Sequence, residues 1–103
     1  MSNTMEQFSL EYLYSECNIK KHCLGAELKE PLIIDGKLYE ELYILKIHLT
    51  EKEEELLITN MAHGIDTNST IVKVLAFVNG QNPYEACEYS IDTDNIKIIN
   101  SIQ

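Results

Sequence analysis

The dipeptide Asp35-Gly36 constrains the fold of this chain more than any other short feature of its sequence. It lies between two apolar runs, "EPLII" before it and "KLYEELYILKIHL" after it. A two-residue type I′ turn needs positive φ at both central residues, and Asp-Gly tolerates that geometry. The sequence therefore predicts a β-hairpin here, with Pro31 at a strand start or at an edge.

The second half of this hairpin admits two interpretations. Residues 42–49 alternate between two faces and are rich in Leu, Ile and Tyr, which favours a strand. The same segment also fits a helical seam of leucines, at Leu38, Leu42, Leu45 and Leu49. A strand is the prediction, and an all-α bundle stays as the structural alternative.

The N-terminal part of the chain has a helical pattern. We expect residues 1–4 to form a flexible tail. In residues 5–17 apolar side chains recur at three- and four-residue steps, with glutamates mostly between them. This predicts an amphipathic helix with Thr4 as its N-cap. Its apolar side consists of Leu10, Leu13, Tyr14 and Cys17.

A second helix is predicted over 51–63. Thr50 and Glu53 form a T-x-x-E capping box, and acidic residues in the first turn suit the positive end of the helix dipole. Gly64 fits the position directly after the helix. The buried side of this helix is expected to consist of Leu56, Leu57, Met61 and Ile58.

Three further elements follow. Residues 70–78, "TIVKVLAFV", predict a central strand buried on both faces. Asn82 as N-cap, Pro83 at the first helical position and Glu85 at the third predict a short helix over "NPYEACEYS", with Tyr84 and Cys87 pointing inward. The segment "IKIINSI" is predicted to be a last strand.

These elements together predict one α+β domain over residues 5–103. It contains an N-terminal helix, a β-hairpin, a capped helix, a further strand, a short helix and a final strand. A chain of 103 residues with 45% hydrophobic content has enough apolar material for a single core.

The charge of the chain limits its partners. Seventeen acidic residues face eight lysines, which gives a formal charge of −9, and the sequence contains no arginine. Arginine is the usual bidentate ligand of phosphate and guanine. We therefore expect no direct nucleic-acid binding, and a basic protein is the expected partner.

The stretch "LTEKEEELL", residues 49–57, followed by "MAHG", locally resembles the start of the DNA-binding domain in quorum-sensing and two-component regulators. There too, Leu-Thr and glutamates open the first helix, so the resemblance implies a helix-turn-helix. The later segments "TIVKVLAFVNG" and "NPYEACEYS" carry one lysine and two glutamates. A recognition helix needs side chains that contact bases and phosphates. A helix-turn-helix regulator is therefore only the second alternative.

The cysteines and histidines suggest no enzyme. Three cysteines form an odd set without a CxxC motif, as expected for reduced thiols in a cytoplasmic protein. No motif places a cysteine beside a histidine base, so we predict neither catalytic residues nor a cofactor. A small-molecule or metal site is the first alternative, built from Cys17, His22, Cys23 and Cys87, although this spacing fits no common zinc pattern.

The sequence shows no membrane segment. No run reaches the roughly 18 apolar residues of a transmembrane helix, and the N-terminus lacks a signal-peptide pattern. We therefore expect a cytoplasmic protein that does not bind membranes.

The sequence predicts a small acidic, non-enzymatic regulator or inhibitor that acts by protein–protein binding. It would occupy a basic, nucleic-acid-handling site on its partner, as phage-encoded and toxin-neutralising inhibitors do. Tyrosine and exposed glutamate are the expected contact residues. The predicted partner-binding set is Glu51, Glu53, Glu54, Glu55, Tyr84, Glu85, Glu88 and Tyr89. The sequence also allows a homodimer.

Overall fold

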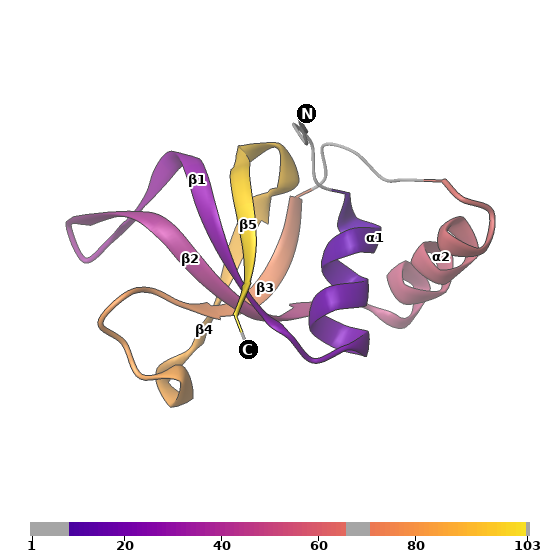
Figure 1. Cartoon of the computed structure of the whole chain (residues 1–103), viewed down its shortest axis with the longest axis horizontal. Helices are drawn as coiled ribbons and strands as arrows, with labels where there is room; N and C mark the ends of the chain where they lie inside the picture. The colour runs from indigo at the N-terminus through magenta and orange to yellow at the C-terminus, as the bar shows by residue number, and fades with distance from the viewer. Residues whose placement is uncertain (1–8, 66–70, 103) are drawn as a thin grey trace.

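A computed structural model describes residues 9–65 and 71–102. The chain forms one five-stranded antiparallel sheet with the strand order β4-β3-β2-β1-β5. The helices lie on one side of this curved sheet (Figure 1). The elements in chain order are α1 (Leu10–Leu13), a π-helical continuation η1 (Tyr14–Ile19), β1 (Cys23–Ile34), β2 (Lys37–His48), α2 (Glu51–Ala62), β3 (Ile71–Phe77), a 3-10 turn η2 (Pro83–Glu85), β4 (Cys87–Asp92), a 3-10 turn η3 (Thr93–Asn95) and β5 (Ile96–Ile102).

The predicted α+β class is confirmed, and the all-α alternative is not favoured. Asp35 and Gly36 have φ values of 52° and 81°, as a type I′ turn requires. The hairpin register places Ile34 opposite Lys37. Of residues 42–49, which also fit a helical seam, residues 42–48 belong to strand β2, which ends at His48.

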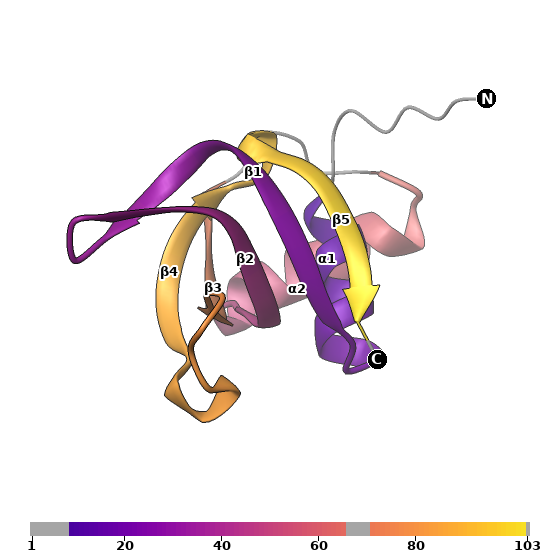
Figure 2. The same ribbon diagram turned by 60° about the vertical axis from the view of Figure 1, so that its left-hand side comes forward.

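The β1–β2 hairpin extends beyond the rest of the sheet as an arm (Figure 2). The pairing of β1 with β5 ends at Leu28, and the pairing of β2 with β3 begins at Tyr43. Further toward the turn, the two strands pair only with each other. There, Ile33 and Leu38 are cross-strand partners, 71% and 67% exposed.

The N-terminal helix begins with a serine cap. Ser9 Oγ accepts a hydrogen bond of 3.2 Å from the backbone N–H of Tyr12. The predicted apolar side is confirmed, since Leu10, Leu13, Tyr14 and Cys17 are all buried. The predicted N-cap Thr4 and the tail 1–4 lie outside the described residues. The unbroken helix predicted from Met5 is wrong at Ser9, whose backbone is extended (φ −79°, ψ 155°), so the described helix begins at Leu10.

Helix α2 begins at the predicted residue and ends at Ala62, one residue before the predicted end, with His63 as its C-cap. Thr50 Oγ1 accepts from the backbone N–H of Glu53 (3.2 Å), and Glu53 Oε1 accepts from the backbone N–H of Thr50 (2.8 Å). At the other end Gly64 has a φ of 69°, and its N–H donates to the carbonyl of Met61. The N–H of Ile65 donates to Asn60, which completes a Schellman motif.

The predicted buried side of α2 is only partly right. Leu57 is buried and Met61 half-buried, whereas Leu56 and Ile58 are 63% and 51% exposed. The reason is the position of the helix. It packs beside α1, outside the layer that covers the sheet, so only one narrow stripe of its surface is covered (Figure 1).

Strand β3 is covered on one face, so the expected burial on both faces is wrong. Val72, Val74 and Ala76 point into the core, while Ile71 and Lys73 are exposed. Helices cover only one side of the antiparallel sheet, and the alternation along β3 follows from that single covered face.

The short helix predicted over residues 82–90 is also wrong beyond its first turn. The cap is present, because Asn82 Oδ1 accepts from the backbone N–H of Tyr84. The chain then leaves the turn and forms β4, an edge strand paired with β3. Tyr84 is 97% exposed and Cys87 is exposed at that edge, so neither points inward.

Candidate binding groove beside helix α2

The four glutamates predicted on α2 do not share one face. Consecutive helical residues diverge by about 100°. Glu54 Oε2 accepts a 2.7 Å hydrogen bond from the hydroxyl of Tyr14, the first residue of η1. Glu53 belongs to the capping box. Glu51 and Glu55, one helical turn apart, are exposed and form no ion pair with any described residue.

The other four predicted residues lie elsewhere. Glu85 closes the cap of η2, because its Oε1 accepts from the backbone N–H of Asn82 at 3.1 Å. This turn, in orange, lies far from α2 (Figure 1). Tyr84 protrudes from it, and Tyr89 packs half-buried against the core. Glu88 approaches the α2 side of the molecule through its contact with His48, near the start of α2. The structure therefore does not gather the predicted set into one surface.

A groove of about 690 Å³ lies between α2 and the adjacent part of the sheet. Its apolar lining comes from α1, the end of β2, α2 and β3. Leu10, Leu57 and Val72 are buried residues at its floor, and Leu49 is half-buried. These residues also belong to the core or pack against it, so the groove is a gap at the margin of the core.

The two sides of the groove expose large apolar side chains. On α2 the lining residues include Glu53, Leu56, Leu57 and Asn60, which follow the i, i+3, i+4, i+7 spacing of one helix side. Leu56 is 63% exposed, and Ile71 on β3 is 71% exposed. Two such side chains around one concavity leave apolar area in water that a partner can cover.

The polar groups of the groove have different partners. His48 lies at the end of β2, and its Nδ1 contacts Glu88 Oε2, which links β2 to β4. Lys73 on β3 is exposed and forms no ion pair with any described residue. No cysteine lines the groove, so its described lining offers no thiol and histidine pair for nucleophilic chemistry.

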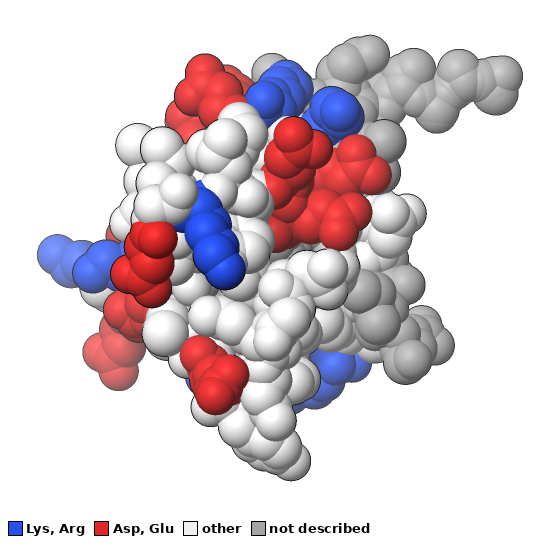
Figure 3. Space-filling model, turned by 90° about the vertical axis from the view of Figure 1, so that its left-hand side faces the viewer, with Lys and Arg blue, Asp and Glu red and all other residues white. Residues whose placement is uncertain are grey.

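A second acidic surface lies on the hairpin side of the molecule, and two of its carboxylates, those of Glu27 and Glu41, have partners. Figure 3 shows acidic and basic side chains next to one another on this side. Glu27 and Glu41 are cross-strand neighbours, an arrangement that is unfavourable for like charges. Lys97 Nζ lies 3.9 Å from Glu27, and the hydroxyl of Tyr43 donates to Glu41 at 3.0 Å. Glu51 and Glu55 on α2 lack such compensation among the described residues.

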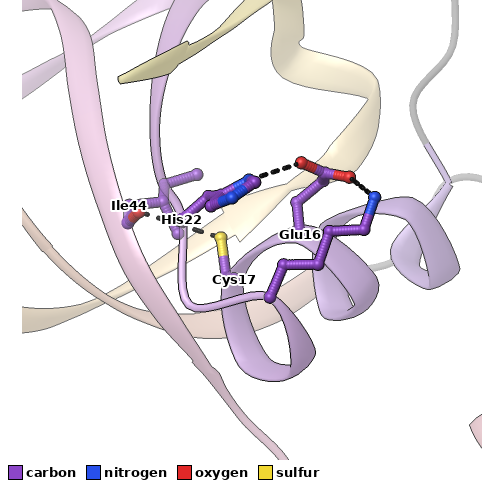
Figure 4. Close-up of polar contacts among 5 residues, drawn as sticks. Glu16, Cys17, His22 and Ile44 are labelled. Atoms are coloured by element: carbon purple, nitrogen blue, oxygen red, sulfur yellow. Dashed lines mark hydrogen bonds and ion pairs between the residues drawn. The ribbon is translucent and has the colours of Figure 1, made fainter. Parts of the chain in front are cut away.

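The cysteines and histidines of the alternative site do not converge. Figure 4 shows that the His22 ring and the Cys17 thiol point to different partners. His22 Nδ1 lies 3.1 Å from Glu16 Oε1, and Lys20 Nζ lies 2.9 Å from Glu16 Oε2. The hydrogen bonds from Lys20 and His22 lower the pKa of Glu16. This cluster fastens the end of η1 to the start of β1.

The thiols have three different environments. The Cys17 thiol is buried and contacts the carbonyl of Ile44 at 3.8 Å, and burial raises its pKa to about 12. Cys23 is half-buried, and Cys87 is exposed on β4, separated from β1 by β2 and β3. Within residues 9–65 and 71–102, no three His, Cys, Asp or Glu side chains are arranged to hold a metal ion.

The groove was not predicted from the sequence. The sequence feature that could have revealed the groove is a surplus of apolar residues on α2. Leu56 and Ile58 fall outside the buried stripe of Leu57 and Met61. Helical periodicity shows which residues share a face, but it does not show how much of that face the neighbouring elements cover. The continuous apolar run 70–78 predicts a strand buried on both faces, so the sequence gives no sign that Ile71 is exposed.

The structure defines the protein as a small α+β domain with a partly apolar groove beside α2. The chain matches no protein-family model, no curated protein and no solved structure. Among the described residues, no helix has the length and apolar content to span a bilayer.

Proposed function

We propose that this chain is a non-enzymatic regulator or inhibitor that binds a basic protein partner through α2 and the groove beside it. One observation carries the proposal: the apolar groove lies beside α2, and the same helix exposes on its outer side the carboxylates of Glu51 and Glu55, which form no ion pair with any described residue. Protein interfaces commonly combine an apolar centre with a charged rim. The carboxylates of α2 would attract a basic partner, and the groove would hold it.

The overall charge supports a basic partner. A formal charge of −9 with no arginine disfavours contact with phosphate groups and favours a positively charged protein surface. A protein that handles nucleic acid carries such a surface, which an acidic inhibitor of the phage or toxin-neutralising kind would occupy. The helix-turn-helix alternative lacks support, because strand β3 follows α2 in the described residues where that motif needs a helix.

We also propose that the protein acts in the cytoplasm as a monomer or homodimer. Cys17, Cys23 and Cys87 are free thiols, as is usual in a reducing compartment. The β4 and β5 edges of the sheet are unpaired among the described residues and are the surfaces through which two copies would pair.

A small apolar ligand is the second candidate. The groove volume of about 690 Å³ falls within the range of ligand pockets, about 300–1,000 Å³. This candidate uses the groove and not the cysteines. It predicts that a small molecule co-purifies with the protein, which native mass spectrometry would detect as a discrete added mass.

The proposal is tested by capture of a partner from a nuclease-treated host lysate. The bait proteins are the wild type, Glu51→Lys/Glu55→Lys, and the control Glu30→Lys/Glu40→Lys. The control residues are exposed on the hairpin arm. Both double variants change the formal charge from −9 to −5, because each replacement adds two positive charges.

We expect one basic protein to be retained by the wild type and by the arm control but lost from the α2 variant. Equal loss from both variants would mean that only net charge matters. Equal retention by all three baits would contradict a role for the acidic side of α2.

A further inference from the structure

We infer that the groove binds an amphipathic, basic helical segment of the partner, with its apolar side chains between Leu56 and Ile71. This inference rests on the proposed function and deepens it, because it specifies the kind of segment that the partner presents. Helix-in-groove binding places apolar side chains at i, i+3, i+4 and i+7 into such a concavity.

The exposed apolar residues provide the first argument. Leu56 on α2 and Ile71 on β3 flank the groove while more than half of each side chain is in water. The floor residues Leu57 and Val72 are buried, so the site has an apolar base between two exposed apolar side chains. A buried apolar base with exposed apolar sides suits a ligand or partner that inserts apolar side chains into the groove.

The length of the groove limits the segment. On α2 its lining runs from Glu53 to Asn60, two turns of helix and about 10 Å. A docked helix therefore places about two turns, with two or three apolar side chains, along this wall.

Charge complementarity determines the orientation of the segment. Glu53 is on the α2 wall, whereas helical periodicity places Glu51 and Glu55 on the opposite, outer side of the same helix. The opposite wall carries Lys73, and His48 there is already paired with Glu88. The basic residues of the segment therefore lie on the α2 side.

A second copy of this chain does not fit the same description. Its eight lysines are scattered, and only Lys20 and Lys21 are adjacent. Lys20 is already paired with Glu16. Two chains of charge −9 also repel each other. The basic segment therefore belongs to another protein.

The inference is tested with a defined peptide. The probe is a fluorescently labelled leucine–lysine peptide of about 14 residues, or four helical turns, with its leucines on one helical side. The control peptide has the same composition in an order that scatters the leucines around the helix. Fluorescence anisotropy at about 0.15 M salt compares their affinities, so that exposed charges are partly screened.

Three protein variants assign the contribution of each surface. Leu56→Gln/Ile71→Gln makes the groove walls polar, and the matched control Ile33→Gln/Leu38→Gln changes two equally exposed apolar residues on the hairpin arm. Glu51→Lys/Glu55→Lys reverses the two charges on the outer side of α2. All six residues are exposed, so these variants are expected to fold, which circular dichroism verifies.

We expect the patterned peptide to bind at least about tenfold more tightly than the scattered one. The groove variant should lose this preference, and the arm variant should keep it. Equal affinity of the two peptides, or an unchanged preference in the groove variant, would overturn the inference.

The two proposals fail in different ways. If the α2 charge variant weakens both peptides but the groove variant weakens neither, the groove inference is wrong and the basic-partner proposal stands. If the groove variant loses binding and the charge variant does not, the proposed role of the acidic side of α2 is wrong. If a chain without residues 1–8 binds at least about tenfold more tightly, the chain's own N-terminal segment occupies the groove, which overturns the assignment to a partner.

Discussion

The hydroxyl of Tyr14 donates a 2.7 Å hydrogen bond to Glu54 and so joins the two helices across 40 residues of sequence. The bond to this carboxylate raises the pKa of Tyr14. Tyr14 is buried at the start of η1, which continues α1, whereas Glu54 is exposed on helix α2. This contact therefore helps to position α2, and with it one wall of the groove.

Replacement of Tyr14 by Phe should lower the free energy of unfolding by about 1.5 kcal/mol, because a hydrogen bond to a charged acceptor is lost. Urea unfolding followed by circular dichroism measures this change. Tyr43→Phe is the matched control, since its hydroxyl donates to Glu41 at an exposed position. We expect Tyr43→Phe to lower the free energy of unfolding by less. Equal losses would show that the Tyr14 hydrogen bond stabilises the fold no more than the exposed one.

Asn18 provides a second long-range contact. Its side-chain amide donates to the carbonyl of Ile47 and accepts from the N–H of the same residue, both at 2.9 Å. Asn18→Leu should cost about 2–3 kcal/mol, because the polar backbone groups of Ile47 lose their partner. Asn18→Asp keeps the acceptor and loses the donor at neutral pH. It should regain stability below about pH 4, where the carboxyl group is protonated. Stability of Asn18→Asp that is independent of pH would contradict this account.

The cap of α2 gives a prediction for the helix itself. Thr50→Ala should lower stability by about 1 kcal/mol, since the N–H of Glu53 loses its acceptor. Thr59→Ala, at an exposed position in the same helix, should be neutral or slightly stabilising because alanine favours helix. Thermal unfolding of the two variants side by side measures the difference. A similar effect at both positions would show that the cap does not matter.

The thiols should differ in reactivity. Cys87 is exposed and should be alkylated first by iodoacetamide in the native protein, followed by Cys23. Cys17 is buried, and burial raises its pKa to about 12, so it should react only when the chain unfolds. Mass spectrometry of peptides from a time course gives the order. Early modification of Cys17 would contradict its burial.

The shifted pKa of Cys17 also has a consequence for stability. In the unfolded chain the thiol ionises near its ordinary pKa of 9.0, whereas in the folded protein it stays neutral toward pH 12. The unfolded state therefore loses its proton first, and the contribution of this group is complete below pH 9 and is lost as the pH rises toward 12. Cys17→Ala should show a smaller loss of stability over this range than the wild type.

Local chemistry explains which parts of the fold were predictable. The turn at Asp35-Gly36, the box of Thr50 and Glu53 and the helix end at Gly64 each depend on a few neighbouring residues. Such features specify backbone geometry wherever the rest of the chain lies. The cap at Asn82 was also correct, but a cap determines only where a turn begins. The following residues form β4 because they pair with β3.

The candidate site was less predictable because it depends on contacts that are distant in sequence. The pair of His48 and Glu88 and that of Tyr14 and Glu54 each join residues 40 positions apart. Neither contact can be inferred without the strand register and the position of the helices. The exposure of Leu56 likewise depends on how α2 packs beside α1 and not on the helical pattern.

The most direct test of the account is the rate at which the captured basic partner associates with α2. Surface plasmon resonance would compare the wild type, Glu51→Lys/Glu55→Lys and the arm control Glu30→Lys/Glu40→Lys at low and high salt. Electrostatic steering predicts that the α2 variant associates about tenfold more slowly at low salt, that the control changes much less, and that the difference shrinks at high salt. Association rates that are the same for all three proteins at low salt would contradict binding through the acidic side of α2.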